Sequence, residues 1–218
     1  MKIEAGVPCR AGYLRRALAL VATTTALLAS SLPSVAQSSS SHADEVPVLI
    51  LVRHADKAAQ PADDPPLTAA GAKRAQDLAA TLRTAGIAAI ITTQLRRTRD
   101  TAQPLAAALG LTPEVLNVGE RALVANPAPG QQFPPEVLKE RAEYVKALQA
   151  TIRRLSGIVL VVGHDWSVPG LIAALGGPQL PNICSSMYDN LFVLISTKGK
   201  ASLIQARYGA PTPGTDCK

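Results

Sequence analysis

The stretch of sequence that decides the fold is Val46-Pro47-Val48-Leu49-Ile50-Leu51-Val52, which is followed directly by Arg53 and His54. An unbroken apolar run of this length, rich in β-branched residues, predicts a strand buried on both faces, as in a parallel sheet. In open α/β sheets, ligands bind beyond the carboxyl ends of the strands. The order of these residues therefore places a guanidinium and an imidazole where a ligand would bind.

A second apolar stretch repeats this arrangement. Ile158-Val159-Leu160-Val161-Val162-Gly163 ends on His164, and the third histidine of the chain, His42, lies in a Ser-rich stretch near the N-terminus. A single histidine at a strand end is more often a hydrogen-bonded structural residue than a catalyst. Two histidines at equivalent strand ends, one of them preceded by Arg53, favour a functional site.

Residues 1–36 have the layout of a secretory signal peptide. A basic start is followed by an apolar segment at 17–29, and Ser34 and Ala36 supply small residues for a cleavage site. The apolar segment is too short to span a bilayer. We expect cleavage after Ala36 and a periplasmic or secreted protein with no stable membrane insertion; an uncleaved anchor is the alternative.

The 182 residues that remain after cleavage suit one domain at 46–218, preceded by a flexible polar linker at 37–45. The leader carries four of the 22 basic residues and one of the 16 acidic ones, so the net charge falls from +6 to about +3. Nucleic acid is not an expected partner, because aromatic residues make up only 3% of the chain. The sequence does not indicate an oligomeric state.

Cysteine usage points to a disulfide and not to a metal. Cys9 would leave with the leader, and the remaining pair, Cys184 and Cys217, is expected to be bonded in an exported protein. Two free thiols are the alternative. Neither CxxC nor paired-histidine spacing occurs, so no metal ion or other cofactor is expected.

Strand-like and helix-like patterns alternate along the domain. The expected strands lie at 46–52, 87–91, 114–118, 158–163, 191–196 and 201–207, and a turn at Lys198-Gly199 joins the last two. The first expected helix lies between the cap Thr68 and Gly86, and the second stops at Gly110. A third helix is expected at 137–155, with Leu138 on its apolar face, and a short fourth near 169–175. This alternation predicts a three-layer αβα domain with a mostly parallel central sheet.

Three arginines, Arg96, Arg97 and Arg99, follow the strand at 87–91 at the entry to a helix. An anion is well received at a helix N-terminus, and the planar fork of arginine pairs two phosphoryl oxygens at once. We expect Arg96 and Arg99 to lie on a solvated helix face, and the assignment of Arg97 depends on the resemblance described next.

Four motifs in order resemble the histidine phosphatase superfamily, with its phosphoglycerate-mutase-like fold. Arg53-His54-Ala55 is similar to its Arg-His-Gly signature, and Thr93 to Thr101 is similar to its Thr-x-x-x-Arg-Thr-x-x-Thr segment, with Arg97 as the arginine. Val162-Gly163-His164 matches the second histidine, and residues 64–68 with Gly71 resemble its Leu-Thr-x-x-Gly element. The resemblance runs from about Val46 to Arg207 and is that of a small, exported branch-1-type member. Ala55 replaces the family's glycine, a change that we expect to be tolerated.

The resemblance implies a phosphatase that hydrolyses phosphomonoesters through a phosphohistidine on His54. Arg53, Arg97 and His164 would hold the phosphoryl oxygens and stabilise charge in the transition state. Lys57 is a further candidate phosphate contact. Nearby arginines disfavour an imidazolium, so they would keep His54 neutral and nucleophilic.

The general acid stays open among three carboxylates. Glu120 lies 23 residues after Arg97, close to where small phosphatases of this family carry their acid. Asp165 directly follows the second histidine, and Asp56 lies close to the nucleophile. We favour Glu120 slightly.

The expected substrate is a small or exposed phosphomonoester. The loops at 60–66 and 119–135 are expected to shape specificity, but their sequences do not identify the substrate. A protein phosphohistidine phosphatase is the alternative within the same superfamily, and a non-catalytic anion-binding protein is the alternative from another class. Mutase activity is disfavoured, because the chain is short and exported. The presence of His54, which a pure binder would not need, favours an enzyme.

Overall fold

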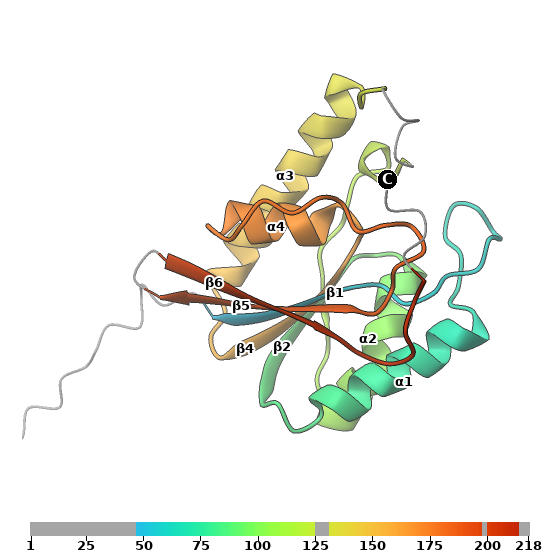
Figure 1. The fold of residues 1–218 in the computed structure, drawn as a ribbon, viewed down its shortest axis with the longest axis vertical. Coiled ribbons are helices and arrows are strands. Elements are labelled where there is room, and N and C mark those ends of the chain that lie inside the picture. The colour runs from blue at the N-terminus through green and yellow to red at the C-terminus, as the bar shows by residue number, and fades with distance from the viewer. Residues whose placement is uncertain (1–46, 125–130, 198–199, 214–218) are drawn as a thin grey trace, which may run out of the picture. The chain divides into compact units, whose positions relative to one another are not determined.

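The computed structural model describes residues 47–124, 131–197 and 200–213. The expected leader, the linker and the turn at Lys198-Gly199 lie outside these residues. The described residues form a six-stranded sheet with the order β3-β2-β4-β1-β5-β6, covered by helices on both faces (Figure 1). Within the described residues, no helix is both long enough and apolar enough to cross a membrane.

The strands are β1 (Val48–Arg53), β2 (Ile87–Thr92), β3 (Glu114–Val115), β4 (Ile158–Gly163), β5 (Asn190–Thr197) and β6 (Lys200–Arg207). The helices are α1 (Ala69–Leu82), α2 (Arg96–Leu109), α3 (Pro135–Ile152) and α4 (Ser167–Ala174), with a short 3-10 helix η2 (Arg121–Leu123). The pairs β1–β4, β2–β4 and β2–β3 are parallel, whereas β5 runs antiparallel to both β1 and β6. The predicted three-layer αβα fold with a mostly parallel sheet is therefore confirmed.

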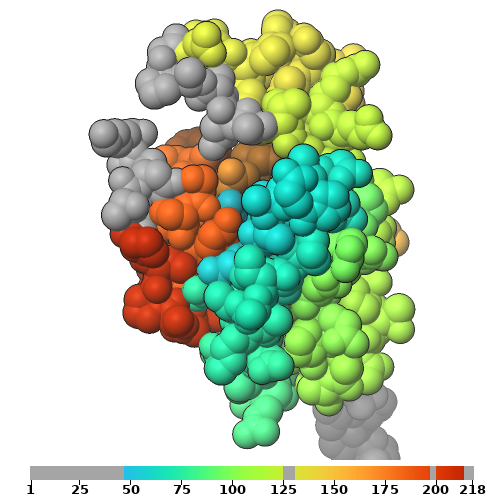
Figure 2. Space-filling model, turned by 90° about the vertical axis from the view of Figure 1, so that its right-hand side faces the viewer, coloured from blue at the N-terminus to red at the C-terminus, as the bar shows by residue number. Residues whose placement is uncertain are grey.

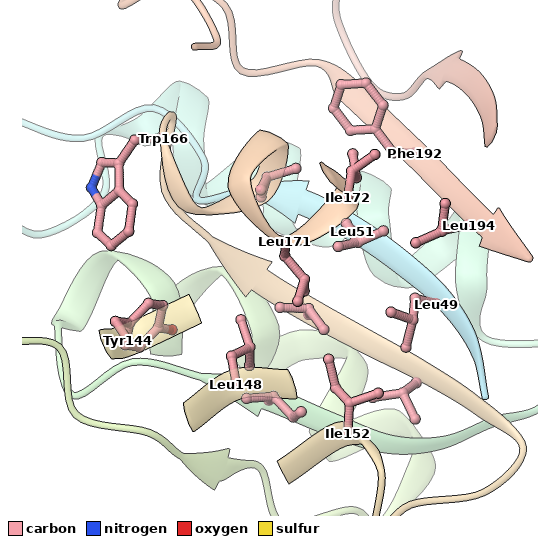
Figure 3. Close-up of a cluster of buried hydrophobic side chains, with 14 of the residues drawn as sticks. Leu49, Leu51, Tyr144, Leu148, Ile152, Trp166, Leu171, Ile172, Phe192 and Leu194 are labelled. Carbon is pink, nitrogen blue, oxygen red and sulfur yellow. The ribbon is translucent and has the colours of Figure 1, made fainter. Parts of the chain in front are cut away.

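Strand β1 is buried on both faces because its side chains alternate between two cores. Leu49 and Leu51 belong to the core cluster under α3 and α4 (Figure 3). Ile50 and Val52 belong to the second cluster, which α1 and α2 cover. None of the four side chains is more than 6% exposed. The apolar run thus forms a strand in the middle of a three-layer domain, as the sequence predicts.

Two predicted helix boundaries are confirmed. The side chain of Thr68 caps α1 by accepting a hydrogen bond from the backbone N–H of Gly71 at 3.0 Å. Gly110 ends α2 in the left-handed conformation with φ of 65°, which glycine adopts without a steric cost.

The prediction for α3 is wrong at the end of the helix, which stops at Ile152 and not at residue 155, and at Leu138. Leu138 does not lie on the apolar face, since 52% of its surface is exposed. The buried residues of the helix are Val137, Arg141, Tyr144, Leu148, Thr151 and Ile152. Their spacing of three and four defines a stripe that excludes Leu138. The helix also begins at Pro135, because the fixed backbone angle of proline suits the first helical turn.

Helix α1 approaches the chain after β1 very closely at Gly71. The backbone N–H of Thr68 donates to the carbonyl of Asp56 at 2.9 Å. A methyl group on Gly71 would overlap that same carbonyl oxygen. The Leu-Thr-x-x-Gly element therefore needs its glycine for space, and it sets the path of the chain directly after the nucleophile candidate.

Candidate active site

Three neighbouring strands bring the predicted residues to one edge of the sheet. In the order β2-β4-β1 all three strands are parallel, so their carboxyl ends meet. Arg53 is the last residue of β1, His54 and His164 directly follow β1 and β4, and Arg97 lies in the first turn of α2, after β2. Figure 2 faces this side of the molecule, where the chain after β1 (cyan) and the segment before β5 (orange) border a hollow.

The two histidines lie next to each other. Arg53 pairs with Gly163 in register, and the backbone N–H of His54 donates to the carbonyl of Gly163 at 3.0 Å. The imidazole centroids are 5.6 Å apart with an interplanar angle of 65°. The rings are 3% and 2% exposed, for His54 and His164 respectively. The structure thus brings together two residues that are far apart in the sequence.

The environment of His54 keeps its ring neutral. Burial lowers the pKa of His54 well below the ordinary value of 6.5, and the nearby charges of Arg53 and Arg97 lower it further. The ring atom Nδ1 lies 2.9 Å from the carbonyl oxygen of Ala55. Since a carbonyl only accepts, this contact assigns the proton to Nδ1. The lone pair of Nε2 is then available for attack.

His164 is held neutral by the same forces. Burial, followed by the charges of Arg97, Arg53 and Arg141, lowers its pKa from 6.5 to about 3. Its Nε2 lies 3.4 Å from Oγ1 of Thr93, and the ring of Trp166 stacks on it at 6.2 Å.

Hydrogen bonds hold Nη1 of Arg53, whereas its Nε has no hydrogen-bond partner among the described residues. Its Nη1 donates to the backbone carbonyls of Cys184, Ser185 and Met187 at 2.7, 3.0 and 3.0 Å. The guanidinium belongs to a side chain that is 4% exposed, and its buried Nε has no hydrogen-bond partner among the described residues. A buried N–H without a partner is costly, so this atom points to an anion that the site would bind.

Arg97 repeats this pattern from α2. Its side chain is 8% exposed, and its buried Nε also lacks a partner within the described part of the chain. Burial lowers the pKa of Arg97, while the carboxylates of Asp64 and Asp165 act in the opposite direction. Arg96 and Arg99 are exposed, as predicted.

The N-terminus of α2 differs from the expectation that it would receive the anion directly. The carboxylate of Asp64, from the loop after β1, accepts the backbone N–H of Arg96 at 2.8 Å. Asp64 thereby serves as a helix cap, since Leu95 at the cap position offers no side-chain hydrogen bond.

Lys57 lies at the rim of the site. Its side chain is exposed, yet burial of part of it and the charges of Arg97 and Arg53 lower its pKa. The charge of Asp165 acts on the pKa of Lys57 in the opposite direction.

The three carboxylate candidates have separate environments. Asp56 forms an ion pair with Arg74 at 2.7 Å, so it is committed to holding α1. The charge of Asp165 acts on Lys57, Arg97 and Arg141, and its Oδ1 accepts the backbone N–H of Trp166 at 3.0 Å. Asp165 therefore balances the cations of the site.

Glu120 is exposed at the start of η2, on a loop tied to the α2 entry. The side chain of Gln94 makes two hydrogen bonds with the backbone of Val118, donating to its carbonyl at 2.8 Å and accepting its N–H at 3.0 Å. This pair fixes the chain two residues before Glu120 next to the segment that carries Arg97.

The sequence analysis missed Tyr188. The guanidinium of Arg53 lies over its ring at 4.3 Å, and the ring is 5.9 Å from that of His54. Strand β5 runs antiparallel to β1, so the start of β5 lies at the edge where β1 ends. The only available signal was a tyrosine just before an expected strand.

Arg141 was missed as well. It is buried on α3, its Nε donates to the carbonyl of Ala122 at 3.1 Å, and its guanidinium lies over the rings of Phe133 and Trp166 at 4.0 and 4.9 Å. Its spacing on α3 resembled that of a solvated helical residue.

Cys184 is disulfide-bonded. Its predicted partner, Cys217, lies outside the described residues, so the pairing stays a prediction. Within the described ranges, no group of three histidine, cysteine or acidic side chains is placed to hold a metal ion.

The fold and this edge define an α/β protein in which two imidazoles lie beside buried guanidinium groups. Residues 49–118 match the histidine phosphatase superfamily (branch 1), a stretch that includes Arg53, His54 and Arg97. This match covers 70 of the 218 residues and agrees with the resemblance seen in the sequence, which implied a phosphatase. No curated protein matches the chain.

Solved structures share the fold at low identity. The mycobacterial glucosyl-3-phosphoglycerate phosphatase is 21% identical, with a TM-score of 0.52 over 72% of this chain and 96% of its own. A putative alpha-ribazole-5'-P phosphatase from Escherichia coli is 17% identical, with a TM-score of 0.53 over 74% and 96%. The protein histidine phosphatase SixA, complexed with tungstate, is 19% identical, with a TM-score of 0.52 over 73% and 96%.

The buried neutral histidines predict a loss of stability in acid. In the unfolded chain each imidazole takes up a proton below pH 6.5, whereas folded His164 takes it up only near pH 3. The unfolded state therefore binds more protons between these values, and the free energy of unfolding falls as the pH falls below 6.5. The test compares the free energy of unfolding, from urea denaturation, at about pH 7 and about pH 4. Between these two pH values, His164→Gln should lose roughly 3 kcal/mol less of this free energy than wild type loses. The control is Arg99→Ala, which changes an exposed side chain and should keep the wild-type pH dependence. If His164→Gln loses as much free energy of unfolding between these pH values as wild type does, the prediction is wrong.

Proposed function

We propose that this histidine phosphatase is an exported enzyme that hydrolyses phosphomonoesters through a phosphohistidine on His54. One observation carries the proposal: the paired imidazoles, 5.6 Å apart, are flanked by Arg53 and Arg97, whose buried Nε atoms have no partner in the described residues. Phosphoryl oxygens would supply those partners, and guanidinium groups bind them strongly.

The reaction follows from the placement of protons. Nε2 of His54 attacks phosphorus, a P–N bond forms, and the P–O bond to the leaving alcohol breaks. A carboxylic acid protonates the departing oxygen. The resulting carboxylate then takes a proton from water, which attacks phosphorus, breaks the P–N bond and releases orthophosphate. Arg53, Arg97 and His164 stabilise the charge on the phosphoryl oxygens in both steps.

The burial of the site supports a monoester as substrate. The reacting ring of His54 is 3% exposed, so the phosphoryl group must enter among buried side chains. A monoester offers three non-bridging oxygens to Arg53, Arg97 and His164. A diester offers only two and carries a second substituent that would have to enter with them.

Glu120 is our choice of general acid. It directly follows the loop segment that Gln94 ties to the α2 entry, whereas Asp165 is surrounded by the charges of Lys57, Arg97 and Arg141. An exposed acid in the free enzyme is compatible with this role, because catalytic contacts often form only with substrate bound.

Export is supported by the leader-like residues 1–36 and by the disulfide at Cys184, since disulfides persist in oxidising compartments. Residues 1–36 themselves lie outside the described ranges. We expect N-terminal sequencing of the protein recovered from the periplasm or medium to begin at Gln37. An intact Met1 on that protein would contradict the leader.

Replacing the nucleophile should abolish turnover. We expect His54→Ala to lower phosphomonoester hydrolysis by about 10³-fold or more, because the covalent route is lost. The assay is phosphate release from a panel of sugar phosphates, nucleotides and a phosphohistidine peptide, with Arg99→Ala as a control on the same arginine-rich segment.

The intermediate itself can be trapped. Rapid quenching of wild type with ³²P-labelled substrate should give an acid-labile, alkali-stable protein adduct that His54→Ala lacks. If wild type turns over substrate without forming such an adduct, the phosphohistidine route is wrong. In the substrate panel, preferential hydrolysis of the phosphohistidine peptide would identify a protein phosphohistidine phosphatase.

Substrates whose leaving groups differ in their need for a proton can show whether Glu120 or Asp165 is the general acid. Glu120→Gln should lower kcat for an alkyl phosphate by about 10²-fold or more, and far less for p-nitrophenyl phosphate, whose leaving group needs no proton. Asp165→Asn should affect both substrates alike. The reverse pattern would assign the acid to Asp165.

A further inference from the structure

We propose that Tyr188 is a positioning residue for Arg53: its ring fixes the guanidinium so that the free Nε–H points to the phosphoryl group. The proposal rests on the phosphate-binding role of Arg53 given above. It assigns a function to a side chain that lies in the segment before β5, outside every motif recognised in the sequence.

Arg53 is held on two sides by the segment before β5. Three backbone carbonyls of residues 184–187 share its Nη1, and the ring of Tyr188 lies 4.3 Å from its Cζ. A guanidinium is planar and rigid, so fixing one amino group and one face also fixes the direction of Nε–H. That N–H is the buried donor without a partner in the described residues.

The backbone at Tyr188 is in turn held by a residue that follows β6. The backbone N–H of Tyr188 donates to Oγ1 of Thr212 at 3.3 Å. The neighbouring carboxylate of Asp189 is 3% exposed and accepts from Nη1 of Arg207 at 2.7 Å and from the backbone and hydroxyl of Thr212. Burial alone would raise the pKa of Asp189, but these hydrogen bonds outweigh it and hold the pKa below its usual range.

Tyr188 contacts both the cation and the ring of the nucleophile, and the proposal concerns its contact with the cation. Its ring centroid is 5.9 Å from that of His54, farther than the cation lies from the ring. The ring and the hydroxyl of Tyr188 need separate tests. A cation over an aromatic face is attracted by the ring itself, and phenylalanine provides the same attraction.

The test measures anion binding without turnover. Calorimetric titration of inorganic phosphate and tungstate into Tyr188→Leu should show Kd raised about fivefold to thirtyfold, and Tyr188→Phe should restore Kd to within about twofold of wild type. With the preferred phosphoester, Tyr188→Leu should raise KM by a similar factor and change kcat less. In an Arg53→Ala background, adding Tyr188→Leu should change Kd by less than about twofold, because the residue acts through Arg53.

Phe133→Leu is the matched control, since it removes a ring that lies over a different cation, Arg141, at 4.0 Å. It should leave Kd for phosphate near the wild-type value. Thermal melting shows whether each variant is folded, and Tyr188→Gln replaces Tyr188→Leu if the latter is not.

Three results would overturn the proposal: an unchanged Kd in Tyr188→Leu, an equal loss in Tyr188→Phe, or full additivity with Arg53→Ala. Wild type that binds neither anion would overturn it too. Wild type that binds phosphate but hydrolyses no ester would contradict the proposed function alone.

Discussion

The parallel pairing of β1 with β4 is the constraint on which the rest of the structure depends. With Arg53 opposite Gly163, the backbone N–H of His54 reaches the carbonyl of Gly163 at 3.0 Å. A shift of one residue would turn the side chains of either strand to the opposite face. It would exchange the two core clusters along β1 and separate the imidazoles. The register that builds the core is thus the same register that builds the site.

Charge in the site is arranged so that cations hold an anion and keep the nucleophile uncharged. Arg53 and Arg97 lie close to both histidines, and their charges add to burial in keeping each imidazole neutral. An imidazolium could not attack phosphorus. The same guanidinium groups would bind the phosphoryl oxygens, so one set of charges serves both binding and activation. Asp165 and Asp64 moderate this positive charge from the rim.

The sequence was most informative where one short segment determines its own structure. The apolar runs before His54 and His164, the cap at Thr68 and the stop at Gly110 depend on neighbours in the chain, and each was predicted. Leu138 was misplaced, because a helical pattern offers several possible faces and only packing selects one.

Tyr188 and the three carbonyls that hold Arg53 could not be predicted, because they reach the site through the antiparallel pairing of β5 with β1. No local pattern reports such a pairing. It also gives the C-terminal residues an unexpected place in the chemistry, since Thr212 helps to hold Tyr188 and Asp189. The site is consequently closed by segments from both ends of the described chain: His54 directly follows the first strand, whereas Thr212 supports Tyr188 from beyond the last one.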